Sequence, residues 1–197
     1  VLDSLAACRS DFDARLVRRQ TVLSVYQDDG GFEAAEKKLR AQALLAPGAI
    51  GQLDLESEWL KVADLADRID HAAADQPQQR FAFERVIDGI RLTGQLMNVG
   101  QHAQYRHSLL PLVPSELLST WIDHLALNLS PQTVPHRTTL VAFDKSYVLH
   151  EVTSPETMLT ELLEWYRLGQ KELLPFFPRS AHAYATTSGD ALLAATR

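Results

Sequence analysis

The chain has 197 residues, of which 46% are hydrophobic and 22% are charged. This balance is typical of a globular protein, and the length suits one domain, or one domain with a helical addition. The net charge of −6 argues against a protein that binds nucleic acid over its whole surface, although a local basic strip is compatible with it.

The single cysteine, Cys8, excludes an internal disulfide and a Cys-based zinc site, and it indicates a reducing compartment. No apolar run reaches the roughly 18 residues of a membrane span, and the start is not a signal peptide. We therefore expect a cytoplasmic protein without membrane contact. Since the chain starts with Val1 and stops abruptly at Arg197, we expect a piece excised from a longer protein.

The first third of the chain is predicted to be helical. Apolar residues recur at helical spacing in three segments, at residues 13–27, 32–44 and 53–73. The segments between them are rich in Gly, Asp and Pro, which favour turns and make continuation of a helix costly. We expect residues 1–46 to form an N-terminal helical segment and residues 47–197 to form the main domain.

Three acidic residues, Asp54, Glu56 and Glu58, stand near the predicted start of the third helix. Carboxylates in a first helical turn are stabilised by the positive end of the helix dipole, which is the interpretation we favour. The alternative is an active hydrolase that uses them as metal ligands. No partner motif elsewhere in the sequence supports that alternative.

After the polar linker at residues 75–78, the apolar period changes from 3.6 to 2. The alternation predicts one strand before Asp88-Gly89, which is a hairpin dipeptide, and a second strand over residues 90–99. A turn at residues 100–102 leads to a third strand at residues 103–108. These three strands are expected to form an antiparallel meander.

Two longer helices are predicted in the second half of the chain. The first starts at Pro114, with Ser115 as its N-cap. The second starts at Ser154 as N-cap, with Pro155 at the first helical position, where the missing N–H group of proline costs nothing. Each has an apolar face suited to packing on a sheet.

The remaining segments complete the layout. A hairpin, an apolar connector with two prolines and two short terminal helices are expected at residues 138–152, 173–178, 179–184 and 188–195. The order of helices, meander, helix, hairpin and helices predicts an α/β protein, on the border with α+β. We expect a mixed sheet of about five strands flanked by helices, with an N-terminal helical extension.

The sequence lacks the short motifs of several enzyme classes, including the P-loop, GxGxxG, GxSxG and HExxH. Its seven histidines are scattered, and His102 and His107 lie five residues apart across a turn. A zinc site needs three or four convergent ligands, and no motif ties a histidine to Cys8 as a nucleophile. We therefore expect no bound metal and no cofactor.

One stretch has the outline of a metal-dependent nuclease site without its acids. Such a site needs an Asp at the end of one strand, and an Asp or Glu followed by a Lys on the next, because the acids hold Mg²⁺ and the lysine positions the attacking water. Here Met97 stands in place of the Asp, and Gln104 and Arg106 stand in place of the second acid and the lysine. Met and Gln lack the anionic oxygen that Mg²⁺ prefers, whereas Arg106 retains affinity for phosphate but is a poor base.

Five runs of sequence resemble, in the same order, the C-terminal region of the RecC family, the gamma subunit of the exonuclease V helicase–nuclease. They cover most of residues 13–185 and lie at residues 45–51, 89–96, 105–110, 121–128 and 174–181. The resemblance implies a PD-(D/E)XK, or restriction-endonuclease-like, fold that has lost its active site, which agrees with Met97 and Gln104. It also implies RecB-like and RecD-like partner subunits and duplex or forked DNA as a ligand.

The leading hypothesis is a non-catalytic domain that guides DNA and contacts other subunits in double-strand-break repair and homologous recombination. Its DNA-facing candidates are Arg91, His102, Arg106 and His107; the simpler interpretation is that they are solvated strand residues. The alternative is a pure protein–protein interaction module with no DNA contact. It is favoured by the acidic balance and by Phe176 and Phe177, which form an interface if they are exposed.

Overall fold

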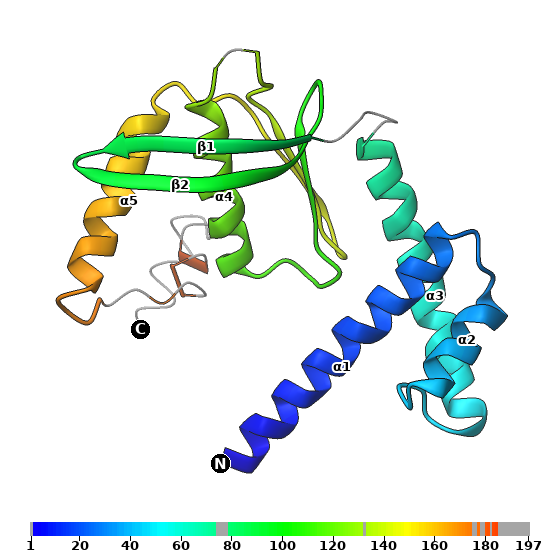
Figure 1. Cartoon of the computed structure of the whole chain (residues 1–197). Coiled ribbons are helices and arrows are strands. Elements are labelled where there is room, and N and C mark those ends of the chain that lie inside the picture. Colours follow the sequence, from blue (N-terminus) through cyan, green and yellow to red (C-terminus); the bar gives the residue numbers. More distant parts are fainter. Residues whose placement is uncertain are drawn as a thin grey trace. The chain divides into compact units, whose positions relative to one another are not determined.

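The computed structural model describes residues 2–73, 79–131, 133–174, 177, 180–181 and 183–184. Its elements follow the order α1–α2–α3–β1–β2–β3–α4–β4–β5–α5 along the chain (Figure 1). The chain forms two compact units. The helical unit consists of Val1–Asp75, His107–Pro111 and Val141–Ser146, and the sheet unit consists of Gln76–Arg106, Leu112–Leu140 and Tyr147–Arg197.

The helical unit contains the three predicted helices, α1 (Leu2–Gln27), α2 (Phe32–Ala41) and α3 (Gly48–Ala73). Their apolar faces meet in one core, which includes Val22, Leu39, Leu55 and Val62, all fully buried. At its margin the rings of Tyr26 and Phe32 lie edge-on to Trp59, with ring centroids 5.7 and 5.9 Å away. The prediction of three amphipathic helices is confirmed.

α3 begins at Gly48, earlier than the predicted start near residue 53. Gly51 suggested a loop, but in the structure it permits a close approach: a Cβ atom at this position would lie 1.9 Å from the carbonyl oxygen of Ala46. The early start places Asp54, Glu56 and Glu58 beyond the first turn, which holds no acidic residue. Their interpretation as first-turn carboxylates is therefore wrong.

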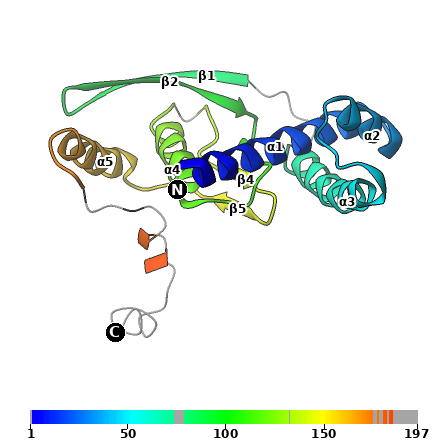
Figure 2. The same cartoon turned by 90° about the horizontal axis from the view of Figure 1, so that it is seen from below.

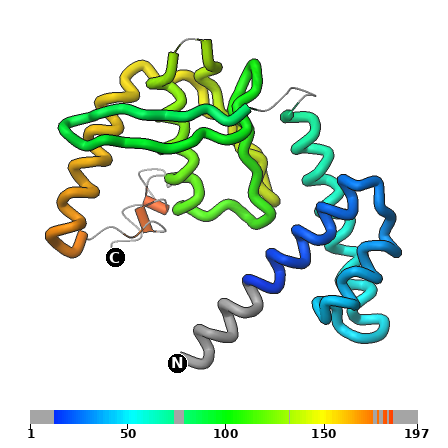
Figure 3. Tube along the Cα trace, viewed as in Figure 1, coloured from blue at the N-terminus to red at the C-terminus, as the bar shows by residue number. Residues whose placement is uncertain are grey.

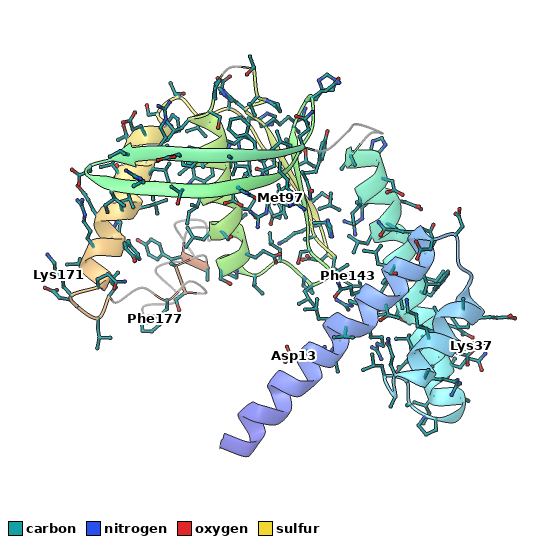
Figure 4. All side chains as sticks on the ribbon, viewed as in Figure 1. Asp13, Lys37, Met97, Phe143, Lys171 and Phe177 are labelled. Carbon is teal, nitrogen blue, oxygen red and sulfur yellow. The ribbon has the colours of Figure 1, made fainter. Side chains whose placement is uncertain are left out.

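Two arginines of the helical unit bind the backbone of the later segments that belong to it. Arg68 donates hydrogen bonds to the carbonyl oxygens of Ala142 (2.9 Å) and Phe143 (3.0 Å). Arg19 donates to the carbonyl oxygen of Leu109 (2.8 Å), and its guanidinium lies 3.6 Å from the ring centre of Phe143 (labelled in Figure 4). These contacts attach residues 107–111 and 141–146 to the helices.

The sheet has five strands in the order β1-β2-β3-β4-β5, and their bounds are Gln79–Ile87, Ile90–Val99, Gln104–His107, Thr138–Val141 and Ser146–Leu149. β1, β2 and β3 are antiparallel neighbours. β3 and β4 run parallel, because the N–H groups of Gln104 and Ser108 donate to the carbonyl oxygens of Arg137 and Val141, advancing in the same direction. The predicted mixed sheet is thus confirmed.

The β1–β2 hairpin closes at the predicted Asp88-Gly89 turn. Both residues have positive φ, 48° and 75°, as a type I′ turn requires, and Ile87 stands opposite Ile90. Glycine adopts this conformation without strain, whereas aspartate tolerates it. The turn therefore sets the register of the whole hairpin.

α4 (Pro114–Asn128) and α5 (Pro155–Gly169) cover one face of this hairpin (Figures 1 and 2). Buried apolar side chains of both helices meet those of the strands, and the set is Phe83, Ile87, Leu96, Val99, Leu125, Ala126, Leu127, Leu159 and Leu163. Since α4 follows β3 and precedes the parallel β4, it is the crossover helix of a βαβ unit. This crossover brings α4 behind the β2–β3 junction.

The helix starts show one further difference from prediction. Val113, rather than Ser115, is the N-cap of α4, because Pro114 takes the first helical position. The start of α5 at Ser154 and Pro155 is as predicted, although the Ser154 side chain makes no capping hydrogen bond. Within the described part of the chain, no helix has the length and apolarity to cross a membrane. The predicted helix at residues 188–195 lies outside the described residues.

Candidate functional site

Met97, Gln104 and Arg106, which the sequence analysis interpreted as positions of a vacated nuclease site, lie where β2 meets β3, and the chain path there can be followed in Figure 3. Val99 at the end of β2 stands opposite Gln104 at the start of β3. Between them the N–H group of Gly100 donates to the carbonyl oxygen of Ala103 at 2.9 Å. The two strands are thus direct neighbours, as the nuclease outline requires.

β2 carries a bulge at Met97 and Asn98. The strand pairs Leu96 with Phe81 but Val99 with Gln79, so two residues of β2 stand opposite one residue of β1. Asn98 has a φ of 56°, in the left-handed region, which permits the extra residue. Leu96 and Val99 consequently both face the core, and the Met97 side chain is 41% exposed (Figure 4).

Gln104 is 1% exposed, and its carboxamide is held on both sides. Its Nε2 atom donates to the carbonyl oxygen of Met97 at 3.2 Å. Its Oε1 atom lies 3.3 Å from the hydroxyl of Thr138, which is fully buried on β4. A neutral side chain that both donates and accepts suits these two partners, whereas a carboxylate cannot donate to a carbonyl.

The polar network continues from Thr138 to α4. Nδ1 of the fully buried His124 lies 2.9 Å from the Thr138 hydroxyl, and Nε2 lies 2.9 Å from the carbonyl oxygen of His150. Because a carbonyl only accepts, Nε2 carries the proton in the bond to His150, and the single hydroxyl hydrogen of Thr138 lies within reach of both His124 Nδ1 and Gln104 Oε1. Burial lowers the pKa of His124 below its ordinary value of 6.5, and the hydrogen bond to His150 offsets this only in part.

Asn128, one turn further along α4, extends the network to the start of the α5 segment. Its Nδ2 atom donates to the carbonyl oxygen of His124 at 2.7 Å, and its Oδ1 atom accepts from the N–H group of Val152 at 2.9 Å. The network therefore joins β2, β3, β4 and α4 through side chains that lie within hydrogen-bonding distance of one another and of the backbone.

Among the described residues, no three His, Cys, Asp or Glu side chains gather in a way that would hold a metal ion. At the junction of β2 and β3, the side chains at positions 97 and 104 are a thioether and a carboxamide. Mg²⁺ binds hard anionic oxygens, so these two side chains do not fit it.

Comparison with known proteins identifies the family of the chain. The family model described as RecC C-terminal domain matches residues 6–189. The chain belongs to the RecC C-terminal domain family. It is also similar to the RecBCD enzyme subunit RecC of Escherichia coli (strain K12), with 29% identity over 171 residues, covering 85% of this chain. The match spans 15% of the length of that relative.

In this member of the RecC C-terminal domain family, the side chain of Arg106 has an acidic partner. Its guanidinium, 28% exposed, forms an ion pair with the carboxylate of Asp123 on α4. Burial lowers the pKa of Arg106, and the charge of Glu116 opposes this shift. A phosphate at this position would have to share the guanidinium with Asp123.

The other DNA-facing candidates do not form one cluster with Arg106. Arg91 is 72% exposed, lies next to the hairpin turn and is 3.7 Å from Glu84. His102 is exposed in the turn after β2, so about 30 Å of strand separates it from Arg91. His107 is exposed, and as the neighbour of Arg106 on β3 it points to the opposite face of the sheet.

The structure also shows where the three acids of the hydrolase alternative lie. Glu58 is buried and binds Arg19, with Arg18 3.7 Å away, so it serves an ion pair within the helical unit. Asp54 and Glu56 are exposed on α3. These three residues are not part of any group that would hold a metal ion in the described chain.

Of the two partner-interface candidates, Phe177 is 69% exposed (Figure 4), and Phe176 lies outside the described residues. α5 exposes further aromatic rings at Trp165 (56%) and Tyr166 (61%). Tryptophan and tyrosine are enriched among the residues that dominate binding at protein interfaces. Sequence reasoning placed these two in the apolar face of the helix and did not single them out.

Sequence reasoning also missed the polar partners of Gln104, Arg106 and His124. Asp123 contacts Arg106 because α4 crosses behind the sheet, Thr138 contacts Gln104 because β4 pairs with β3, and Asn128 contacts His124 one turn away on α4. One signal was available: His124 and Asn128 stand four residues apart on the apolar face of a predicted helix. A polar pair at that spacing within a core face needs internal hydrogen bonds, and it therefore marks a network.

Proposed function

We propose that this chain is the non-catalytic, nuclease-like domain of an exonuclease V gamma subunit. In that role it guides DNA and contacts partner subunits during double-strand-break repair and homologous recombination. The observation that carries the proposal is Gln104, which occupies the position of a metal-binding acid but is buried and bonded to Met97 and Thr138. A domain kept for its shape, rather than for hydrolysis, has no need of an anionic ligand there.

The proposed fold is the PD-(D/E)XK type. In its favour are the three antiparallel strands, the crossover helix α4 and the parallel strand β4. The bulge at Met97 and Asn98 is a further argument, since bulges and left-handed residues occur often beside active sites. The sheet thus retains the irregular backbone of a site whose ligands are absent.

A hydrolysis assay tests the catalytic part of the proposal. The purified chain is incubated with linear duplex and single-stranded DNA in Mg²⁺ and in Mn²⁺, and we expect no cleavage above buffer. Cleavage that is abolished by Arg106→Ala but retained by the exposed control Arg91→Ala would contradict the proposal. That pattern would show that Arg106 acts in an active centre.

The DNA-guiding part depends on whether Arg106 reaches phosphate. RecB-like and RecD-like subunits are the proposed partners, so DNA binding is measured on the complex that they form with the intact gamma subunit. Arg106→Ala is expected to weaken binding and to reduce the slope of log affinity against log salt by about one. Asp123→Ala is the matched variant: it releases Arg106 from its ion pair and is expected to strengthen binding.

Unchanged affinity in both variants, with complexes that remain assembled, would remove DNA guidance from the proposal. The alternative would then stand, which is a protein–protein interaction module without DNA contact. The pairing of Arg106 with Asp123 and the exposure of Trp165, Tyr166 and Phe177 favour it. Loss of partner-subunit binding in Phe177→Asp, with an unchanged circular dichroism spectrum, would support this alternative.

A further inference from the structure

α5 carries apolar side chains on two opposite sides. On its inner side, Leu159 and Leu163 are buried together with Leu125 of α4 and Ile87 of β1. Trp165 lies two residues beyond Leu163, which is about 200° around the helix, so it points away from this core. A surface helix ordinarily has one apolar stripe, with polar residues opposite it. The second apolar side of α5 therefore calls for a contact of its own.

Four exposed residues at regular spacing make up this second side, and we refer to them as the outer stripe: Met158, Glu161, Trp165 and Leu168. Their intervals of three, four and three residues are those of the seam along which one helix packs on another. The outer stripe extends over about 15 Å of the helix. Exposed apolar side chains that are contiguous mark interaction sites, and tryptophan is enriched among the residues that dominate binding.

The charge of α5 restricts what can cover the outer stripe. The helix contains three acidic residues and one basic residue, Arg167, which is bound to Asp88 in the hairpin turn. Glu161 lies within the outer stripe and Glu164 beside it, and both are exposed. None of the ion pairs among the described residues includes either of these two acids. The outer side of α5 is thus both apolar and negatively charged.

Electrostatic complementarity then requires an occupant with positive charge. A DNA phosphate would be repelled, and α5 of a second copy of this chain would bring like charges together. Glu161 and Trp165 are four residues apart, so their side chains are neighbours on the helix surface. An arginine can bind a carboxylate through two hydrogen bonds and can also stack on an indole ring. This pair of residues therefore fits an arginine between two apolar contacts.

We propose that the outer stripe is the docking site for an amphipathic helix of a partner subunit. That helix packs apolar side chains on Met158, Trp165 and Leu168, and it places an arginine against Glu161 and the ring of Trp165. The inference rests on the proposed function, in which the chain contacts partner subunits. It adds the surface of the contact and the chemistry of the partner segment that binds there.

Binding of the intact gamma subunit to purified RecB-like and RecD-like subunits, each measured separately, tests the proposal. Trp165→Ala is expected to weaken binding to one of them by about thirtyfold, whereas Trp165→Phe keeps an aromatic ring and retains most of the affinity. Glu161→Lys is expected to weaken the same complex about tenfold, and less at high salt. Glu33→Lys on the exposed side of α2 and Tyr184→Ala, an exposed aromatic residue outside α5, are the controls with unchanged affinity.

Thiol labelling shows whether the occupant belongs to another subunit. Thr157→Cys introduces a thiol at the exposed rim of the outer stripe and leaves the stripe intact. In the intact gamma subunit alone, labelling at position 157, followed by mass spectrometry of the peptide, is expected to be rapid. It is expected to slow in the complex, whereas labelling of the control Lys37→Cys on α2 (Figure 4) is not. Slow labelling at position 157 in the gamma subunit alone would overturn the proposal, because the same polypeptide would then cover the stripe.

The binding results separate this inference from the proposed function. A complex that forms equally well with Trp165→Ala and Glu161→Lys would overturn the docking site and leave subunit contact through another surface. A parent gamma subunit that binds neither partner subunit would contradict the proposed function itself. Circular dichroism and thermal unfolding are expected to be unchanged in both variants, because both side chains are exposed.

Discussion

The Nε2 atom of Gln104 donates a hydrogen bond to the carbonyl oxygen of Met97, 3.2 Å away. In the nuclease-like fold that we propose, these are the two positions that correspond to the metal-binding acids. A carboxylate at position 104 would place an oxygen against that carbonyl oxygen. The two oxygens would repel each other, and little water could screen them because residue 104 is 1% exposed. Gln104, which stands at the position of a metal ligand in the proposed fold, thus joins β3 to the bulge in β2.

This relation predicts the stability of variants at position 104. Gln104→Leu leaves the Met97 carbonyl and the Thr138 hydroxyl without one partner each, and we expect a loss of about 1–3 kcal/mol in the free energy of unfolding. Gln104→Glu is expected to lose at least as much at neutral pH, because it buries a charge beside an acceptor. Urea unfolding measures both variants. Gln95→Leu on exposed β2 is the control, with a change within about 0.5 kcal/mol.

The different pH dependence of the two variants would be diagnostic. In Gln104→Glu the new side chain regains a donor when its carboxyl is protonated, so the deficit relative to the parent is expected to shrink as the pH falls. The deficit of Gln104→Leu is expected to stay constant, because leucine does not titrate. Equal stability of all three chains at neutral pH would show that the buried carboxamide makes no contribution to folding.

The pKa of His124 gives a second prediction. Burial lowers this pKa in the folded chain below the ordinary value of 6.5, so between the two values the unfolded chain binds more protons. The stability that neutral His124 provides is therefore fully present above about pH 6.5 and is lost as the pH falls through the folded pKa. We expect the free energy of unfolding to decrease in this window. In His124→Gln the decrease is expected to be smaller, whereas in the exposed control His102→Gln it persists; a slope unaffected by His124→Gln would contradict the assignment.

Periodicity and turn chemistry predicted most elements of the fold, because both are local. The amphipathic stripes located α1 to α5, and Asp88-Gly89 located the hairpin turn. Gly51 led to the wrong prediction of a loop, because its role is to permit the close contact with Ala46. Such a contact depends on the path of the chain in space. A glycine that permits close packing and a glycine that ends a helix have the same appearance in a sequence.

The candidate site was predictable in outline only. Strand alternation placed Met97 and Gln104 on neighbouring strands, and the structure has these strands side by side. The bulge at Asn98 and the hydrogen bond from Gln104 depend on a register shift that no local pattern specifies. The ion pair of Arg106 with Asp123 depends on the crossover of α4 behind the sheet. Contacts of this kind join elements that are distant in the sequence, and hydrophobic periodicity does not predict them.

A third prediction concerns the buried ion pair of Arg19 and Glu58, which are 9% and 6% exposed. Removing one partner leaves the other charge buried, so Glu58→Leu is expected to cost about 3–5 kcal/mol in the free energy of unfolding. The double variant Arg19→Met/Glu58→Leu removes both charges and is expected to lose less than the sum of the two single variants. Guanidinium unfolding of the three variants completes the cycle, and strict additivity would contradict a coupled pair.

The last prediction compares one substitution at two glycines of the same hairpin. Gly89 has a φ of 75° in the turn, where a side chain is strained, so Gly89→Ala is expected to cost about 1–2 kcal/mol. Gly94 has no left-handed φ, and no atom lies within 4 Å of the place that a Cβ atom would take. Gly94→Ala is therefore expected to stabilise the chain by about 0.4–1 kcal/mol. Thermal unfolding measures both. A loss at Gly94 as large as that at Gly89 would mean that the strand, and not the turn, requires glycine.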